Sequence, residues 1–235
     1  MRTLVGTSGY SYKEWKGKFY PDDLPAKDML RFYAGRFDTV EINNTFYRMP
    51  SSSLLAQWSS QVPDGFSFAI KASRRITHQS RLNDTTETVG YLLDATAQLE
   101  AKRGPLLFQL PPNFRLDLER LESFLAGLPE DGPPVAMEFR HPSWFSDEVY
   151  AALRARDVAL CISDGELDGE PPFVSTASWG YLRLRGVEYD GDELAGWAAR
   201  IRGQDWSRAW VFFKHEDEAT GPLLAERFRE LFGDT

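Results

Sequence analysis

The chain has 235 residues, of which 42% are hydrophobic and 26% charged, the composition of an ordinary globular protein. Its net charge of −8 argues against a protein that coats duplex DNA over its whole surface. No apolar stretch approaches the roughly 18 residues that a membrane-spanning helix needs, and the first residues lack the apolar segment of a signal peptide. With Cys161 as its single cysteine the chain forms no internal disulfide, and we expect a cytoplasmic location.

Eight short apolar runs that end at turn residues predict eight β-strands along the chain. Several of them are continuously apolar, as is typical of strands buried on both faces. The predicted strands are residues 4–7, 39–43, 66–71, 105–110, 135–139, 159–162, 181–184 and 210–214.

Helical periodicity lies between these runs. Apolar stripes predict helices over residues 85–102 and 116–128, and Ser146 is the expected N-cap of another. A C-terminal helix is expected to begin at Pro222, because proline favours the first helical position. The side chains that this last helix is expected to bury are Leu223, Leu224, Phe228 and Leu231.

Alternating strands and helices predict a parallel sheet. Eight such units in 235 residues fit a compact TIM-like (β/α)8 barrel, a single domain over residues 1–235. A doubly wound open sheet is the alternative, although Gly6-Thr7-Ser8-Gly9 lacks the spacing of a dinucleotide-binding turn. In a barrel the functional site lies at the carboxyl ends of the strands, and short loops predict an open, shallow mouth.

Charged and polar side chains recur at these predicted strand ends. Glu41 and Asn43 share the parity that faces the barrel interior, whereas Val40 and Ile42 are expected to pack under the helices. We take this regularity as the main functional signal of the sequence. The other strand ends contribute Lys71, Gln109, Glu138, Arg140, Asp164, Arg183, Arg185 and Lys214.

Two interpretations of this ring stay open. It is a ligand site, or it is a structural ring of ion pairs in which Glu41 pairs with Lys71, and Glu138 pairs with Arg140 or Arg183. A Mg²⁺ or Mn²⁺ site built from Glu41, Glu138 and Asp164 is a further alternative. The three histidines have no His-x-x-x-His spacing, which argues against a multinuclear zinc site, so we assign no metal ligand, and the cofactor stays unknown.

A basic segment follows the third strand. Residues 71–81 carry four Lys or Arg side chains and one histidine in an acidic chain. Arg74, Arg75 and His78 suit a phosphate or another anion, because arginine binds such groups with two parallel hydrogen bonds. A solvated charged loop is the alternative. Carboxylates at 216–218 disfavour a phosphate site beyond the last strand.

Aromatic residues cluster in the predicted loops at the same end of the barrel. If exposed, Tyr10, Trp15 and Trp144 would stack on bases or sugar rings, whereas the alternative is ordinary core packing. Cys161 lies in an apolar run and is expected to be an inert core thiol.

Five stretches carry motifs in chain order: residues 6–12 with Trp15 and 19–21, residues 39–47, Lys71 with 75–78, residues 104–112 and residues 138–144. Taken together, these motifs resemble the YecE-like family of uncharacterised proteins. The resemblance implies a TIM-like barrel and supplies no activity.

The shared motifs fall on the predicted strand ends, and two places depart from the expected pattern. Arg185 precedes Gly186 where relatives more often carry histidine, and Lys214-His215 stands where asparagines are more usual. The motif residues at the strand ends are Glu41, Asn43, Lys71, His78, Gln109, Glu138, Arg140 and His141.

Three functions therefore remain open. The first is a protein that binds, and in one version processes, a phosphate-bearing small ligand, nucleotide or single-stranded nucleic acid at the barrel mouth. The second is a glycosidase-like hydrolase that uses Glu41 and Glu138, with Lys71 and His141 as further candidate catalytic residues. The third is a barrel scaffold without chemistry. The candidate ligand-binding residues are Tyr10, Trp15, Asn43, Arg74, Arg75, His78, Gln109, Arg140, Trp144 and Arg183.

Overall fold

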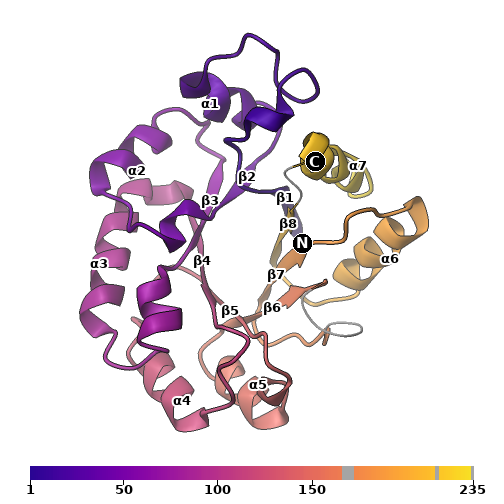
Figure 1. The fold of residues 1–235 in the computed structure, drawn as a ribbon. Helices are drawn as coiled ribbons and strands as arrows, with labels where there is room; N and C mark the ends of the chain where they lie inside the picture. Colours follow the sequence, from indigo (N-terminus) through magenta and orange to yellow (C-terminus); the bar gives the residue numbers. More distant parts are fainter. Residues whose placement is uncertain (166–171, 215–216, 234–235) are drawn as a thin grey trace.

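The computed structural model describes residues 1–165, 172–214 and 217–233. Eight parallel strands close into a barrel in chain order, and the last strand pairs with the first (Figure 1). This confirms the predicted (β/α)8 barrel and excludes the open sheet. The strands are β1 (Arg2–Ser8), β2 (Thr39–Ile42), β3 (Ser67–Lys71), β4 (Arg103–Gln109), β5 (Val135–Glu138), β6 (Ala159–Ser163), β7 (Trp179–Leu184) and β8 (Arg208–Phe213).

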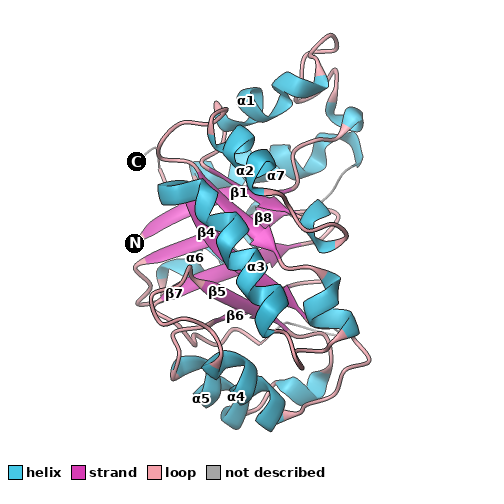
Figure 2. Cartoon of the chain, turned by 90° about the vertical axis from the view of Figure 1, so that its left-hand side faces the viewer, coloured by secondary structure: helices cyan, strands magenta, loops and turns pink. Residues whose placement is uncertain are grey.

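Helices surround the barrel on its outside (Figures 1 and 2). The C-terminal helix α7 packs against β1 and β8, so it covers the seam at which the barrel closes. None of the described helices has the length and apolar content needed to cross a membrane. The described α-helices are α1 (Met29–Ala34), α2 (Ser52–Ser59), α3 (Thr86–Thr96), α4 (Leu118–Ala126), α5 (Asp147–Arg154), α6 (Gly191–Arg202) and α7 (Thr220–Glu230).

Local chemistry sets several helix ends. Asp117 caps α4 by accepting a hydrogen bond from the backbone of Arg120, and Asp190 with Glu193 forms a capping box at the start of α6. The single helix predicted over 85–102 is wrong in its second half. The α-helix ends at Thr96, and the 3-10 segment that follows contains a residue with positive φ, Glu100 at 50°.

The C-terminal helix also corrects the sequence analysis. It begins two residues before Pro222 and buries Leu224 and Phe228 as expected. Leu223 is 45% exposed and Leu231 is 36% exposed, so the prediction that both are buried is wrong. Only the face that carries residues four apart meets the barrel, and Leu223 lies off this face.

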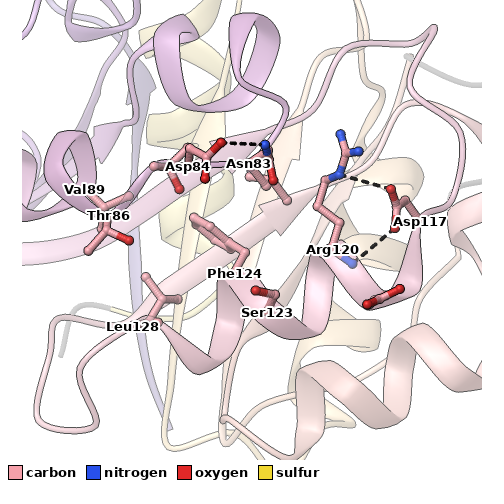
Figure 3. Close-up of a pocket in the computed structure, with 13 residues that line it drawn as sticks. Asn83, Asp84, Thr86, Val89, Asp117, Arg120, Ser123, Phe124 and Leu128 are labelled. Carbon is pink, nitrogen blue, oxygen red and sulfur yellow. Dashed lines mark hydrogen bonds and ion pairs between the residues drawn. The ribbon is translucent and has the colours of Figure 1, made fainter.

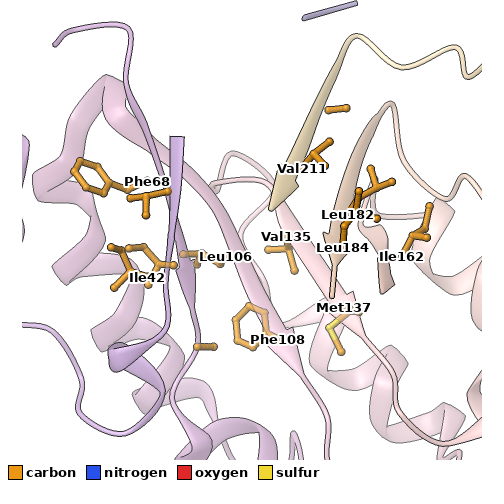
Figure 4. Packing of buried hydrophobic residues seen from close by; sticks show 14 of the residues in the cluster. Ile42, Phe68, Leu106, Phe108, Val135, Met137, Ile162, Leu182, Leu184 and Val211 are labelled. Atoms are coloured by element: carbon orange, nitrogen blue, oxygen red, sulfur yellow. The ribbon is translucent and has the colours of Figure 1, made fainter. Parts of the chain in front are cut away.

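The strand residues divide between two apolar clusters. Outward-facing side chains such as Val40 and Ile42 pack under the helices, as their parity predicted, and Figure 4 shows part of this layer. Inward-facing side chains form a separate cluster inside the barrel. The members of the inner cluster are Leu4, Ala69, Leu107, Ala136, Ala159, Cys161, Trp179, Tyr181, Trp210 and Phe212. The expected burial of Cys161 is confirmed.

Candidate functional site

One guanidinium joins two carboxylates inside the carboxyl-terminal end of the barrel. Arg183 of β7 donates from Nη2 to Oε1 of Glu41 on β2 at 3.0 Å, and from Nη1 to Oε2 of Glu138 on β5 at 2.6 Å. None of the three side chains is more than 3% exposed. A single buried cation therefore holds two anions that come from well-separated strands of the barrel.

The remaining carboxylate oxygens are also occupied. Tyr181 donates its hydroxyl to Oε2 of Glu41 at 2.7 Å, and Asn43 donates from Nδ2 to Oε1 at 3.0 Å. Arg140 donates from Nε to Oε1 of Glu138 at 3.0 Å. Every oxygen of the two carboxylates thus accepts at least one hydrogen bond, as buried charges require.

These contacts keep both carboxylates ionised. Burial by itself would raise the pKa of Glu138, but the positive charges of Arg183, Arg140 and Lys71 outweigh burial and hold that pKa at about 2. The pKa of Glu41 is lowered as well, because Arg183 and the Tyr181 hydroxyl outweigh its burial. Neither group carries a proton near neutral pH.

A cavity of about 330 Å³ opens at this end of the barrel. Its lining holds five cationic side chains and no carboxylate among the described residues, although the chain as a whole is acidic. The cavity lies at the strand ends, where the sequence analysis expected a site. The lining residues are Ser8, Tyr12, Asn43, Asn44, Phe46, Tyr47, Lys71, Arg140, Arg183, Arg185 and Lys214.

Lys71, the last residue of β3, differs from the arginines around it. Its Nζ lies 4.5 Å from the centroid of the Phe46 ring, and no ion pair or hydrogen bond engages this ammonium in the described part of the chain. Burial and the positive charge of Arg183 lower the pKa of Lys71 to about 8, although Glu138 and Glu41 act in the opposite direction. The predicted pair between Lys71 and Glu41 is therefore not formed.

The rest of the basic segment lies apart from the cavity. Arg74 and Arg75 are exposed, and neither lines the cavity, because the chain turns into a π-helix (Arg75–Gln79) directly after β3. His78 is half-buried, with its ring against Phe46 at a centroid distance of 4.9 Å. Burial and the charge of Lys71 lower the pKa of His78. Of the predicted anion-binding segment, only Lys71 reaches the cavity.

Two of the predicted stacking residues are core residues. Trp144 is 0% exposed, stacks on Phe139 at 4.7 Å between centroids and donates from Nε1 to the carbonyl of Phe114 at 2.6 Å. Trp15 is 1% exposed. A buried indole has no free face for a ligand, so the predicted stacking roles of Trp15 and Trp144 are wrong. Tyr10 is half-buried and packs against the apolar core.

Two further candidates have local partners. His141 accepts a hydrogen bond at Nδ1 from the backbone of Ser143 at 3.1 Å, which caps the short helical turn Pro142–Trp144. Gln109 is 4% exposed and donates to the carbonyl of Leu110 at 3.1 Å, beside Glu138 in the strand register. Neither lines the cavity.

Asp164 does not join the two glutamates, which bears on the metal alternative. Its carboxylate accepts hydrogen bonds from the backbone of Arg185 and the hydroxyl of Tyr189. No group of three or more His, Cys, Asp or Glu side chains within the described residues is arranged to hold a metal ion. His215 lies outside the described residues.

Sequence reasoning missed Tyr181. It shares strand parity with Arg183, so the same alternation that places Arg183 inside the barrel would have placed its hydroxyl there too. Two buried atoms at the mouth, Nε of Arg183 and Oδ1 of Asn43, have no hydrogen-bond partner in the described chain. Such orphaned groups are uncommon and fit a site that receives a polar ligand.

A second pocket, of about 380 Å³, is lined by residues 82–89 at the start of α3 and by residues 117–128 along α4 (Figure 3). Its acidic residues Asp84 and Glu119 are exposed, and Asp117 pairs with Arg120 at 3.0 Å. None of its charged side chains is fully buried, and none of its lining residues belongs to a strand. We therefore place the candidate site at the barrel mouth.

Fold and site together define a TIM-barrel protein with a cationic mouth above a buried ionic cluster. Residues 4–235 match the family described as protein of unknown function DUF72, and the chain belongs to this family. It is 25% identical to UPF0759 protein YunF of Bacillus subtilis over 227 residues. The aligned region covers 91% of this chain and 79% of YunF.

Solved structures share this fold. A DUF72 family protein from Thermotoga maritima superposes with a TM-score of 0.87 at 26% identity, over 100% of both chains. A DUF72 family protein from Enterococcus faecalis gives 0.79 at 18% identity, over 100% of this chain and 98% of the other. A D-psicose 3-epimerase crystallised with D-fructose gives 0.60 at 12% identity, over 99% and 97%, and this likeness concerns the fold alone.

Proposed function

We propose that the mouth of the barrel binds a small ligand that carries a phosphate group. The observation that supports this most directly is the charge of the cavity lining. Five cationic side chains surround about 330 Å³, and the two carboxylates nearest to them are already bound to Arg183 and Arg140. Arginine and lysine donors at one concave site suit phosphate oxygens.

The volume of the cavity and the net charge of the protein also support a small anionic ligand. A volume of this order is typical of sites for small molecules. In a chain with net charge −8, a mouth whose charged lining residues are all cationic, within the part of the chain that the structure describes, is a local reversal of sign that attracts anions. Tyr47 is 73% exposed and lines this mouth, so its ring is the surface on which a nucleotide base would stack.

In this proposal the phosphate contacts residues of the cavity and not the exposed arginines that the sequence analysis had suggested. Lys71, Arg140 and Arg185 line the cavity, whereas Arg74 and Arg75 do not. With Trp15 and Trp144 buried, the extended aromatic platform that a single-stranded nucleic acid would need is reduced. A small phosphate ester therefore fits the geometry better than an oligonucleotide.

A glycosidase-like hydrolase is less well supported. Such an enzyme needs one carboxyl group that is protonated near neutral pH, to act as general acid. Glu41 and Glu138 share Arg183, and the pKa of each is lowered. This environment suits a fixed anion and opposes the proton transfer that the hydrolase requires.

The test compares two arginines with the same change of charge. Glycerol 3-phosphate is titrated at low salt into the wild type, Arg140→Gln and Arg75→Gln, with glycerol as the neutral control and a short single-stranded oligonucleotide as a further ligand. A lost charge-assisted hydrogen bond costs about 1.5–3 kcal/mol, so Arg140→Gln should weaken binding roughly 10- to 150-fold. Arg75→Gln should change the dissociation constant by less than about twofold, because Arg75 lies outside the cavity.

The thermal midpoint without ligand shows that both variants are folded. Equal loss in the two variants, or no binding of glycerol 3-phosphate by the wild type, contradicts the proposal. An oligonucleotide that binds more tightly than glycerol 3-phosphate, and that depends on Arg75, would instead return the site to the exposed basic segment.

A further inference from the structure

We infer that Lys71 forms an imine with a carbonyl group of the ligand, so that the ligand class is a phosphate-bearing aldehyde or ketone. The inference rests on the phosphate site proposed above and adds to it a covalent step at one named atom, Nζ of Lys71. The argument comes from the surroundings of this amine and from its contrast with other lysines of the chain.

The contrast with Lys102 shows what is unusual. Lys102 is also largely buried, but its Nζ donates to the carbonyls of Ser59 at 2.8 Å and Val62 at 3.0 Å and lies 3.6 Å from a carboxylate oxygen of Asp64. Lys71 has no such acceptor in the described chain and lines the cavity. Its amine is therefore directed to a space that a ligand can enter.

The carboxylates that would normally hold a buried lysine as an ion pair are already taken. Glu41 and Glu138 bind Arg183, and Arg140 completes the second of them. A guanidinium keeps its proton under all ordinary conditions, whereas an ammonium can lose one. Partial desolvation and the presence of other cations nearby activate the amine of a lysine as a nucleophile.

The proton equilibrium agrees with this geometry. Because burial and Arg183 lower the pKa of Lys71 to about 8, roughly a quarter of the amine is neutral at pH 7.5, against about 0.1% for an ordinary lysine. Phe46 lies 4.5 Å from Nζ, and its ring face stabilises a cation at that position. The same ring would therefore stabilise the protonated imine.

The step balances with the amine and the carbonyl compound alone. The lone pair on Nζ forms a bond to the carbonyl carbon, and the carbonyl oxygen takes both amine protons and leaves as water. A carbon–nitrogen double bond remains, and a proton from solvent converts it to the iminium ion. Arg140 and Arg185 line the same cavity and are the groups that would hold the phosphate during this exchange.

The test traps the imine by reduction. Wild type is incubated with dihydroxyacetone phosphate and cyanoborohydride, which delivers hydride to the iminium carbon and fixes the adduct as a secondary amine. Peptide mass mapping should find Lys71 labelled at least about tenfold more than the exposed Lys27, because the neutral fraction of Lys71 exceeds that of an ordinary lysine by more than this. Excess glycerol 3-phosphate should suppress the labelling of Lys71 alone.

Two variants test the imine. Lys71→Arg keeps a cation in the cavity but cannot form an imine, so it should lose the adduct. Lys27→Arg, a matched change at an exposed lysine, should label as the wild type does.

Each failure has its own signature. Uniform labelling of lysines, with glycerol 3-phosphate still bound, overturns the imine and leaves the phosphate site standing. Labelling of Lys71 that is equal with neutral dihydroxyacetone, and that glycerol 3-phosphate does not suppress, overturns the phosphate-bearing class of ligand together with the proposed function.

Discussion

The two ends of the barrel interior are built from the same inward-facing strand positions, yet they differ in chemistry. Toward the amino ends of the strands the interior is apolar, with Leu4 of β1 and Trp210 of β8 paired in register. Toward the carboxyl ends it becomes ionic, with Glu41, Glu138 and Arg183 in place of the apolar residues.

The difference separates stability from function. The apolar side chains near the amino ends of the strands stabilise the fold because folding removes their surface from water. The buried ion pairs near the carboxyl ends of the strands contribute little net stability, because the desolvation of each charge offsets most of their attraction. A barrel selected only for stability would keep an apolar interior up to the carboxyl ends of the strands. We therefore attribute the ionic side chains there to a function at the mouth of the barrel.

The largest effect is expected from Arg183. Arg183→Met leaves two buried carboxylates without their shared cation, and breaking a buried pair in this way costs about 3–5 kcal/mol of unfolding free energy. Urea unfolding at pH 7 measures the loss. A cost below about 1 kcal/mol would show that other groups hold the two carboxylates in the folded state.

Restoring neutrality sharpens the same comparison. Combining Arg183→Met with Glu41→Gln and Glu138→Gln removes the unpaired charges and should recover most of the lost stability. In the apolar cluster inside the barrel, Leu107→Ala should lower the unfolding free energy by a similar amount, about 2–5 kcal/mol, because it leaves a cavity. No change of charge should restore this loss, since Leu107 is 0% exposed and lies within the apolar cluster.

The next effect is the pH dependence that Glu138 imposes. Its pKa is about 2 in the folded chain, against an ordinary value of 4.5. Between these values the unfolded chain binds more protons, so the unfolding free energy falls as pH falls from about 4.5 to 2. Glu138→Gln should flatten this slope in urea titrations, while Glu41, whose pKa is also lowered, keeps part of it. An unchanged slope would mean that Glu138 is not the stabilised anion.

The sequence predicted most of the fold and several of the side chains that meet at the barrel mouth, because strand parity is a local property. The alternation of Glu41 with Val40 was enough to place the carboxylate inside the barrel. Arg140 and Arg183 were both predicted as alternative partners of Glu138, and both contacts are observed. That Glu41 shares Arg183 with Glu138 was not predictable, since it depends on how strands far apart in sequence meet once the barrel closes. The burial of Trp15 and Trp144 depends on tertiary packing in the same way.

The smallest effect distinguishes the ligand site from a structural ring of ion pairs. Lys71 has a pKa of about 8 in the folded chain against 10.5 ordinarily, so the folded state carries a penalty for the charged amine below pH 8. Between pH 8 and 10.5 the unfolded chain binds more protons, and the stability of the wild type rises with pH.

Lys71→Met removes this penalty. The variant should be more stable than the wild type at pH 7, by roughly 1 kcal/mol, as is usual when a side chain is kept for function at the expense of stability. The advantage should shrink as the pH rises from 8 toward 10.5, and Lys27→Met at the surface should stay within about 0.5 kcal/mol of the wild type throughout. A variant that is less stable at pH 7 would make Lys71 a structural partner of Glu41 and Glu138, and the mouth would then be a ring of ion pairs after all.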